Sequence, residues 1–252
     1  MSIITLLWPA FCLAILLVFI HSIFGLEIIK RGVIFTDLAI GQFAAIGVAV
    51  SLLWFKGHYT FMFTLAFALI GASLITIATY RVKHIEAFIG MLYALGASSI
   101  IILLSHTAQG TELFTKLQAT DILFTTSSDL WEPLFLYSTI AVIFFLFYHK
   151  LTGFYKEALF FGLLALTVTS SVQLAGVLVV FVLLIIPAFL SLLQIRFRNL
   201  PFAWVVGSIL IITAMIISYF FDLPTGYTIV FISSLSGVLS ALIFKGCIDH
   251  EA

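Results

Sequence analysis

The chain has 252 residues, of which 63% are hydrophobic and only 9% charged. A water-soluble domain carries about a quarter of its residues as charged side chains, so this composition excludes a soluble globular protein. The formal net charge is zero, and nucleic-acid-binding proteins carry a basic surface, so a nucleic-acid partner is excluded as well. Two cysteines, Cys12 and Cys247, form no disulfide framework and no metal-binding motif.

Long apolar runs predict an all-α integral membrane protein, because backbone polar groups in lipid must be satisfied within each segment and a bilayer needs about 20 apolar residues per helix. The whole chain, residues 1–252, is predicted to be one transmembrane domain. About nine transmembrane helices are expected, at 3–24, 36–55, 60–80, 86–105, 130–148, 158–174, 177–195, 201–221 and 226–244.

Charge placement predicts the orientation of these spans. If they alternate, nine basic residues fall on one side and only Lys56 and Lys116 on the other. The nine are Lys30, Arg31, Arg81, Lys83, Lys150, Lys156, Arg196, Arg198 and Lys245. The positive-inside rule places them in the cytoplasm, so the N-terminus is predicted outside and the C-terminus inside.

Polar residues at membrane depth are costly and tend to mark a pathway. Asp37 follows Arg31 by six residues and is expected in the inner third of the bilayer; Gln42 is expected near its middle. Each has a structural alternative. Asp37 could cap a helix or pair with Lys30 or Arg31, and Gln42 could make an interhelical hydrogen bond.

Other polar features are less specific. The six histidines do not cluster, and for each of them, including His21, a solvated interfacial position is expected. Pro187 is predicted to kink its span, and residues 106–129 are expected to form an external loop. No catalytic set of Ser and His, His and Glu or paired carboxylates falls at one depth, so an enzyme is not expected.

Three stretches resemble the permease subunits of zinc, manganese and iron ABC importers. Residues 31–47 combine a basic residue, a Phe-Thr-Asp step ending at Asp37 and a helix of small residues ending at Gly47. Residues 89–97, with 121–123 and 128–130, form the second stretch. The third is residues 164–188, which end in Leu-Leu-Ile-Ile-Pro187-Ala. Together these stretches are distributed over residues 27–195.

This resemblance implies the type II-like ABC importer permease fold in a bacterial inner (plasma) membrane. It implies a subunit that moves a divalent metal ion inward, with no bound cofactor and no enzymatic activity of its own. The implied partners are a cytoplasmic ATP-binding subunit, an extracytoplasmic metal-binding protein and a second permease copy in a homodimer. It also implies that Asp37 contacts the metal and that Asp37 and Gln42 line the pathway.

The chain departs from the family pattern in two places. Typical members carry His four residues after this Asp, whereas position 41 is Gly and the nearest polar residue is Gln42. The cytoplasmic segment that couples to the ATPase is also short, about 149–157, where Phe154, Tyr155 and Lys156 are the candidate contact residues. An ATP-independent secondary transporter or channel, or a structural membrane subunit, therefore remain as alternatives.

Overall fold

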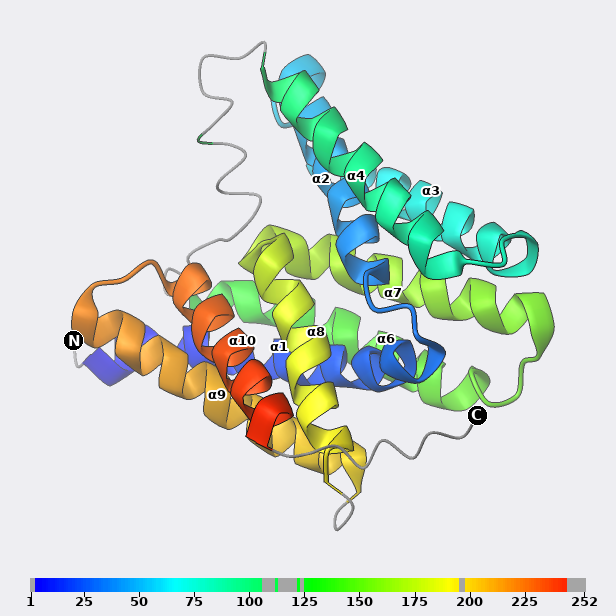
Figure 1. Ribbon diagram of the computed structural model, residues 1–252. Helices are drawn as coiled ribbons and strands as arrows, with labels where there is room; N and C mark the ends of the chain where they lie inside the picture. The colour runs from blue at the N-terminus through cyan, green and yellow to red at the C-terminus, as the bar shows by residue number, and fades with distance from the viewer. Residues whose placement is uncertain (1–2, 106–111, 113–121, 123–124, 195–197, 244–252) are drawn as a thin grey trace.

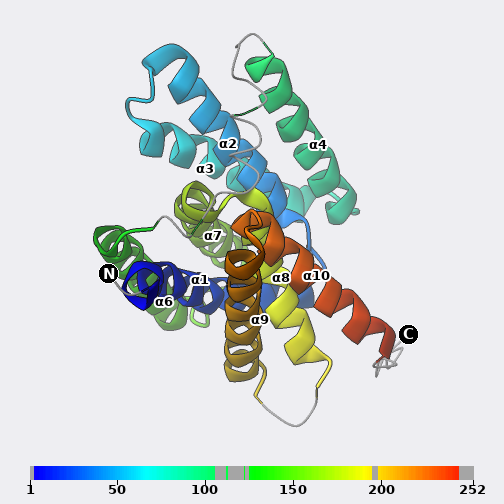
Figure 2. The ribbon, with the colours of Figure 1, turned by 90° about the vertical axis from the view of Figure 1, so that its left-hand side faces the viewer.

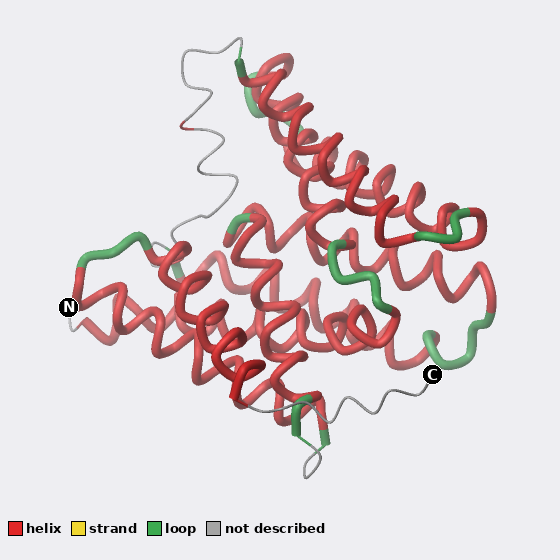
Figure 3. Tube along the Cα trace, viewed as in Figure 1, coloured by secondary structure: helices red, strands yellow, loops and turns green. Residues whose placement is uncertain are grey.

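The computed structural model is entirely helical over the residues it describes, which are all except 1–2, 106–111, 113–121, 123–124, 195–197 and 244–252 (Figures 1 and 3). The predicted external loop at 106–129 lies largely outside the described residues. The helices are α1 (Ile3–Arg31), α2 (Thr36–Phe55), α3 (Thr60–Arg81), α4 (Ile85–Leu104), η2 (Ser127–Leu130), α6 (Trp131–Phe147), α7 (Gly153–Ala175), α8 (Val177–Leu192), α9 (Asn199–Phe221) and α10 (Thr225–Ile243).

Each of the nine predicted spans corresponds to one of these helices, and eight of them are long and apolar enough to cross a membrane. The exception is α8, whose 16 residues reach roughly 24 Å at 1.5 Å per residue. The hydrocarbon core of a bilayer is about 30 Å thick. The expectation of nine full-length spans is therefore only partly right, and α8 is a shorter apolar helix.

Two predicted boundaries are wrong. Helix α1 continues seven residues beyond position 24, to Arg31, because its last turn is stabilised by an ion pair between Lys30 and Glu27 and by contacts of Arg31 with α7. Helix α7 begins at Gly153 and not at 158, so most of the expected cytoplasmic loop is helical. Both extensions contain charged residues, Glu27, Lys30 and Arg31 in α1 and Lys156 and Glu157 in α7, which interrupt the apolar runs used to place the spans.

Helices α2, α3 and α4 form one group, which lies on α7 and α8 (Figures 1 and 2). The remaining helices pack around α1 and α8, with α9 and α10 on one side and α6 at the edge. Helices α1 and α2 are the most buried of the spans, and η2–α6 is the least buried. The positions best shielded from the surroundings of the bundle are therefore on α1 and α2.

Close helix crossings depend on particular glycines. A Cβ atom on Gly47 of α2 would overlap the backbone of Phe63 in α3, and one on Gly25 of α1 would overlap the carbonyl group of Leu184 in α8. Gly176 separates α7 from α8 with a φ of 87°, a backbone conformation that favours glycine. Small residues thus set the spacing of α2 and α3 and of α1 and α8.

The ends of several helices meet on one side of the bundle. A cavity of about 420 Å³ is lined by the end of α1, the end of α3, the start of α4, the residue after α6 and the start of α7. The loops after the first, third and fifth spans therefore share one side, as alternating spans require. That this side faces the cytoplasm remains a prediction from the charge distribution.

Candidate functional site

Asp37 is buried in the first turn of α2, with only 2% of its surface exposed. Neither carboxylate oxygen has a side-chain partner or a well-formed hydrogen bond among the described residues, and the nearest donors to the carboxylate are the backbone amides of Asp37 and Leu38 in its own helical turn. A buried carboxylate without partners is costly, and natural proteins keep few such groups. This arrangement gives Asp37 free ligand atoms in the interior of a helix bundle.

The structural alternatives for Asp37 do not hold. The residue that caps α2 is Phe35, whose side chain makes no cap hydrogen bond, and Asp37 lies within the helix. Lys30 pairs with Glu27, with 3.3 Å between Nζ and Oε1, and Arg31 pairs with Glu157 of α7. Both basic residues proposed as partners of Asp37 are therefore engaged with other carboxylates.

The face of α2 that carries Asp37 is turned toward α7 and α8. Positions 37 and 41 are one helical turn apart on the same face. A Cβ atom on Gly41 would lie 3.1 Å from Cγ1 of Val177 in α8 and 3.8 Å from Cγ1 of Val168 in α7. The glycine found where the family carries His is thus a packing position, and the space for a larger side chain is already occupied.

Gln42 is also buried, with 1% of its surface exposed, but it lies on a different face of α2. A Cβ atom on Gly96 of α4 would lie 2.8 Å from the Cβ of Gln42, so this side chain faces α4. Its Oε1 has no hydrogen-bond partner in the described part of the chain. The structure therefore separates the two predicted pathway residues, with Asp37 toward α7 and α8 and Gln42 toward α4.

The described residues hold no group of three or more His, Cys, Asp or Glu side chains that could bind a metal ion. Asp37 would supply one hard carboxylate ligand. An ion held by one carboxylate keeps other ligands, either water or groups from outside this chain. The donor set suits transient contact with a passing ion better than tight structural binding.

The predicted ATPase-contact residues occupy the first turn of α7, not a loop as expected. Phe154 and Tyr155 are 50% and 74% exposed. Phe154 lies near Tyr80 at the end of α3, with ring centroids 5.8 Å apart, and Nζ of Lys156 lies 4.6 Å from the centroid of the Tyr148 ring. The two aromatic side chains are thus available to a partner, whereas Lys156 packs back onto the bundle.

A buried polar cluster around His21 was not predicted. His21 is fully buried, and the expectation of a solvated histidine is wrong. Its Nδ1 lies 2.8 Å from the carbonyl oxygen of Leu17, and its Nε2 lies 3.2 Å from Oγ of Ser171 in α7. Tyr137 of α6 donates a hydrogen bond of 3.2 Å to Ser170 beside it. The cluster joins α1, α6 and α7, a relation that no short-range spacing reveals.

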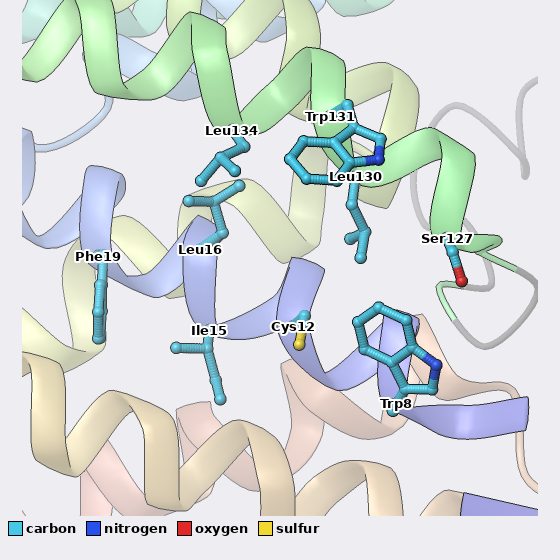
Figure 4. A pocket seen from close by; sticks show the side chains of 9 residues that line it. All are labelled: Trp8, Cys12, Ile15, Leu16, Phe19, Ser127, Leu130, Trp131 and Leu134. Atoms are coloured by element: carbon cyan, nitrogen blue, oxygen red, sulfur yellow. The ribbon is translucent and has the colours of Figure 1, made fainter. Parts of the chain in front are cut away.

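A second cavity, of about 560 Å³, lies between the start of α1 and the η2–α6 segment (Figure 4). Its lining is nearly all apolar, and Trp8 and Trp131 stand near one end of it (Figure 4). None of the predicted site residues lines this cavity. It is therefore separate from the buried carboxylate on α2.

Residues 153–244 match the ABC 3 transport family. The chain also has an ABC permease fold. The structure of PsaBC from Streptococcus pneumoniae in complex with Fab superposes with a TM-score of 0.76 at 22% sequence identity, covering 93% of this chain and 90% of the other. No curated protein matches the chain.

A second solved structure supports the same fold. It is described as an inward-facing conformation of a metal-chelate type ABC transporter, and it matches with a TM-score of 0.72 at 15% identity, covering 96% of this chain and 85% of the other. The resemblance to ABC importer permeases predicted from the sequence is therefore confirmed. The matched family is one of transport proteins, in agreement with a transporter subunit and not an enzyme.

Proposed function

We propose that this chain is the membrane-spanning permease subunit of an ABC importer that moves a divalent metal ion, such as zinc, manganese or iron, into the cytoplasm. The observation that carries the proposal is the Asp37 carboxylate, buried in the ABC permease fold with both oxygens free of hydrogen bonds. Asp37 would contact the ion as it passes. The match of residues 153–244 to the ABC 3 transport family supports the transporter class.

The energy source would be ATP hydrolysis in a separate subunit. Within the residues that the structure describes, the helices form one transmembrane bundle without a nucleotide-binding domain. Phe154 and Tyr155 would contact the ATP-binding subunit, because they are exposed at the end of the bundle where the basic loops gather. An extracytoplasmic metal-binding protein and a second permease copy would complete the complex in a bacterial inner membrane.

Metal as the substrate is supported by the shared fold with a metal-chelate type ABC transporter and by the chemistry of Asp37. A carboxylate favours hard divalent cations, while zinc prefers His and Cys ligands. Because Gly41 stands where the family has His, the site favours manganese or ferrous iron over zinc. Gln42 would line the pathway only if α2 and α4 separate during transport, since it is enclosed by α4.

The test is purification of the chain from its native membranes in mild detergent, followed by mass spectrometry of the proteins that accompany it. Recovery of an ATP-hydrolysing subunit in near-equal amount is the expected result. Hydrolysis by that complex should then respond to Mn²⁺ or Fe²⁺. Repeated isolation of the chain without any ATPase would overturn the importer and favour an ATP-independent transporter, a channel or a structural subunit.

A further inference from the structure

A charged and aromatic cluster connects α1, the segment after α6 and the first turn of α7. The guanidinium group of Arg31 donates one hydrogen bond from Nη1 to Glu157 and another, of 2.7 Å, from Nη2 to the hydroxyl group of Tyr148. That hydroxyl group donates in turn to Oε2 of Glu27 at 2.6 Å. The guanidinium carbon also lies 4.2 Å from the ring centroid of Phe160.

The cluster is shielded from solvent and specific in geometry. The side chains of Arg31 and Glu157 are 19% and 17% exposed, and Tyr148 is buried. Burial raises the pKa of Tyr148 to about 12, so its hydroxyl group stays protonated and can accept from Arg31 while donating to Glu27. The planar fork of arginine can serve two partners at once, which a lysine ammonium on its flexible stem does less well.

Arg31 lies between the two functional regions of the proposed permease. On one side, Glu157 follows the exposed Phe154 and Tyr155 within the same opening turns of α7. On the other side, only residues 32–35 separate Arg31 from the start of α2. That connection is short and tied down, because the amide group of Val33 donates to Ile28 and the hydroxyl group of Thr36 donates to Val33.

We propose that Arg31 is a positioning residue that couples movement of the first turn of α7 to α2, the helix that carries Asp37. The inference rests on the proposed function, in which a partner ATPase contacts Phe154 and Tyr155. A displacement of the first turn of α7 moves Glu157, and Arg31 transmits that displacement through the short connection to α2. Arg31 touches no substrate and acts through Glu157 and Tyr148.

The test measures how α2 responds to nucleotide in the purified complex of permease and ATPase. Spin labels are attached at Trp54→Cys on α2 and Phe220→Cys on α9, which are both exposed positions. The background carries Cys12→Ser and Cys247→Ser, which removes both native cysteines. With arginine at position 31, a non-hydrolysable ATP analogue is expected to shift the distance between the labels.

Arg31→Lys is expected to abolish that shift while the ATPase still co-purifies in the normal ratio. Lysine keeps the positive charge, so the membrane orientation is preserved, but it cannot hold both Glu157 and Tyr148 in the arginine geometry. Lys83→Gln is the matched control, because Lys83 is an exposed cation between α3 and α4, on the same side of the bundle, and is not a member of this cluster. This control should show the full shift.

An ATP-dependent shift that persists in Arg31→Lys would overturn the proposal, and so would the absence of a shift with arginine in place. Loss of the ATPase from the Arg31→Lys preparation would also overturn the proposal, because Arg31 would then be needed to bind the ATPase and not to transmit movement to α2. If Arg31→Lys does not fold, Tyr148→Phe removes one hydroxyl group and should reduce the same shift. Absence of any ATPase from the unsubstituted protein would instead refute the proposed function itself.

Discussion

Gly41 of α2 lies directly against Val177, the first residue of α8, so that a Cβ atom on Gly41 would come within 3.1 Å of Cγ1 of Val177. This contact occupies the space into which a histidine at position 41 would project. Glycine at this position, where the permeases that the sequence resembles carry histidine, is therefore accompanied by close packing of α2 on the amino end of α8. Asp37, one turn away on the same face, is left without a histidine neighbour on its helix.

Gly41→His is expected to destabilise the protein and not to create a zinc site. Forcing a large side chain into a packed interior costs about 1–3 kcal/mol. The melting temperature of the detergent-purified protein measures this effect, and Val177→Ala should restore part of the loss. Gly90→His in α4 is the matched control, because a Cβ atom on Gly90 meets nothing within 4 Å. An unchanged melting temperature in Gly41→His would show that α8 can move away from α2 at this contact without loss of stability.

Asp37→Asn should abolish uptake of Mn²⁺ while leaving membrane insertion and thermal stability nearly unchanged. The carboxylate makes no hydrogen bond in the described structure, so an uncharged amide of the same shape removes the cation ligand without breaking a contact. Radioactive Mn²⁺ uptake by cells is the measurement. Asp222→Asn is the control, since Asp222 is exposed and its left-handed conformation, with a φ of 51°, suits asparagine. Normal uptake by Asp37→Asn would remove Asp37 from the pathway.

Tyr155→Ala should weaken binding of the ATPase without affecting the fold. The side chain is 74% exposed, so little intramolecular packing is lost on truncation, whereas an aromatic residue central to an interface contributes about 2 kcal/mol or more. Phe154→Ala should act in the same direction, with a small additional loss from its contact with Tyr80. The ratio of ATPase to permease after purification measures both effects.

The control for these variants is Phe220→Ala, which truncates an exposed aromatic residue at the end of α9, where the Asp222 turn follows. It should leave the ratio of ATPase to permease unchanged. If Tyr155→Ala and Phe154→Ala also retain the full ratio, then the ATPase contact lies outside the first turn of α7.

Ser171→Ala should lower stability by roughly 0.6–1.7 kcal/mol, the range for interhelical hydrogen bonds within membranes. The substitution leaves Nε2 of the fully buried His21 without its partner on α7. His21→Ala should cost more, about 2 kcal/mol, because it also leaves a cavity. Thermal unfolding in detergent is the measurement. Ser98→Ala on α4 serves as the control, since its exposed hydroxyl group bonds only to Leu95 of its own helix; an equal loss there would argue against the interhelical bond.

Much of the fold follows from local sequence. Every predicted span has a helix, and the bounds of α2 at Thr36 and Phe55 agree with the prediction to the residue. In lipid, an apolar segment of this length must form an α-helix, because its backbone N–H and C=O groups can be hydrogen-bonded only within the segment. The hydropathy pattern therefore predicts the secondary structure. The break between the sixth and seventh spans was also predicted, because the charge distribution favours nine spans over eight; the structure places it at Gly176, which adopts a positive φ.

The site was predicted only in part. A carboxylate at membrane depth identified Asp37 as a candidate, but hydropathy cannot tell whether Lys30 or Arg31 reaches it. That depends on α1 continuing to Arg31 and on Glu157, 126 residues away, lying beside it. In the same way, His21 resembles an interfacial histidine in the sequence and is buried because α7 brings Ser171 against it.

The sequence by itself determined that the chain is a helical membrane protein, where its spans lie and that Asp37 is a carboxylate at membrane depth. These properties depend on the composition of contiguous segments, because the free energy of placing a helix in lipid is set by the residues of that helix. Only the tertiary structure decided which face of α2 meets α8, that Gln42 faces α4 and that Arg31 joins α1 to α7. Those relations depend on contacts between residues far apart in the chain, where the identity of each neighbour fixes whether a polar group is paired or free.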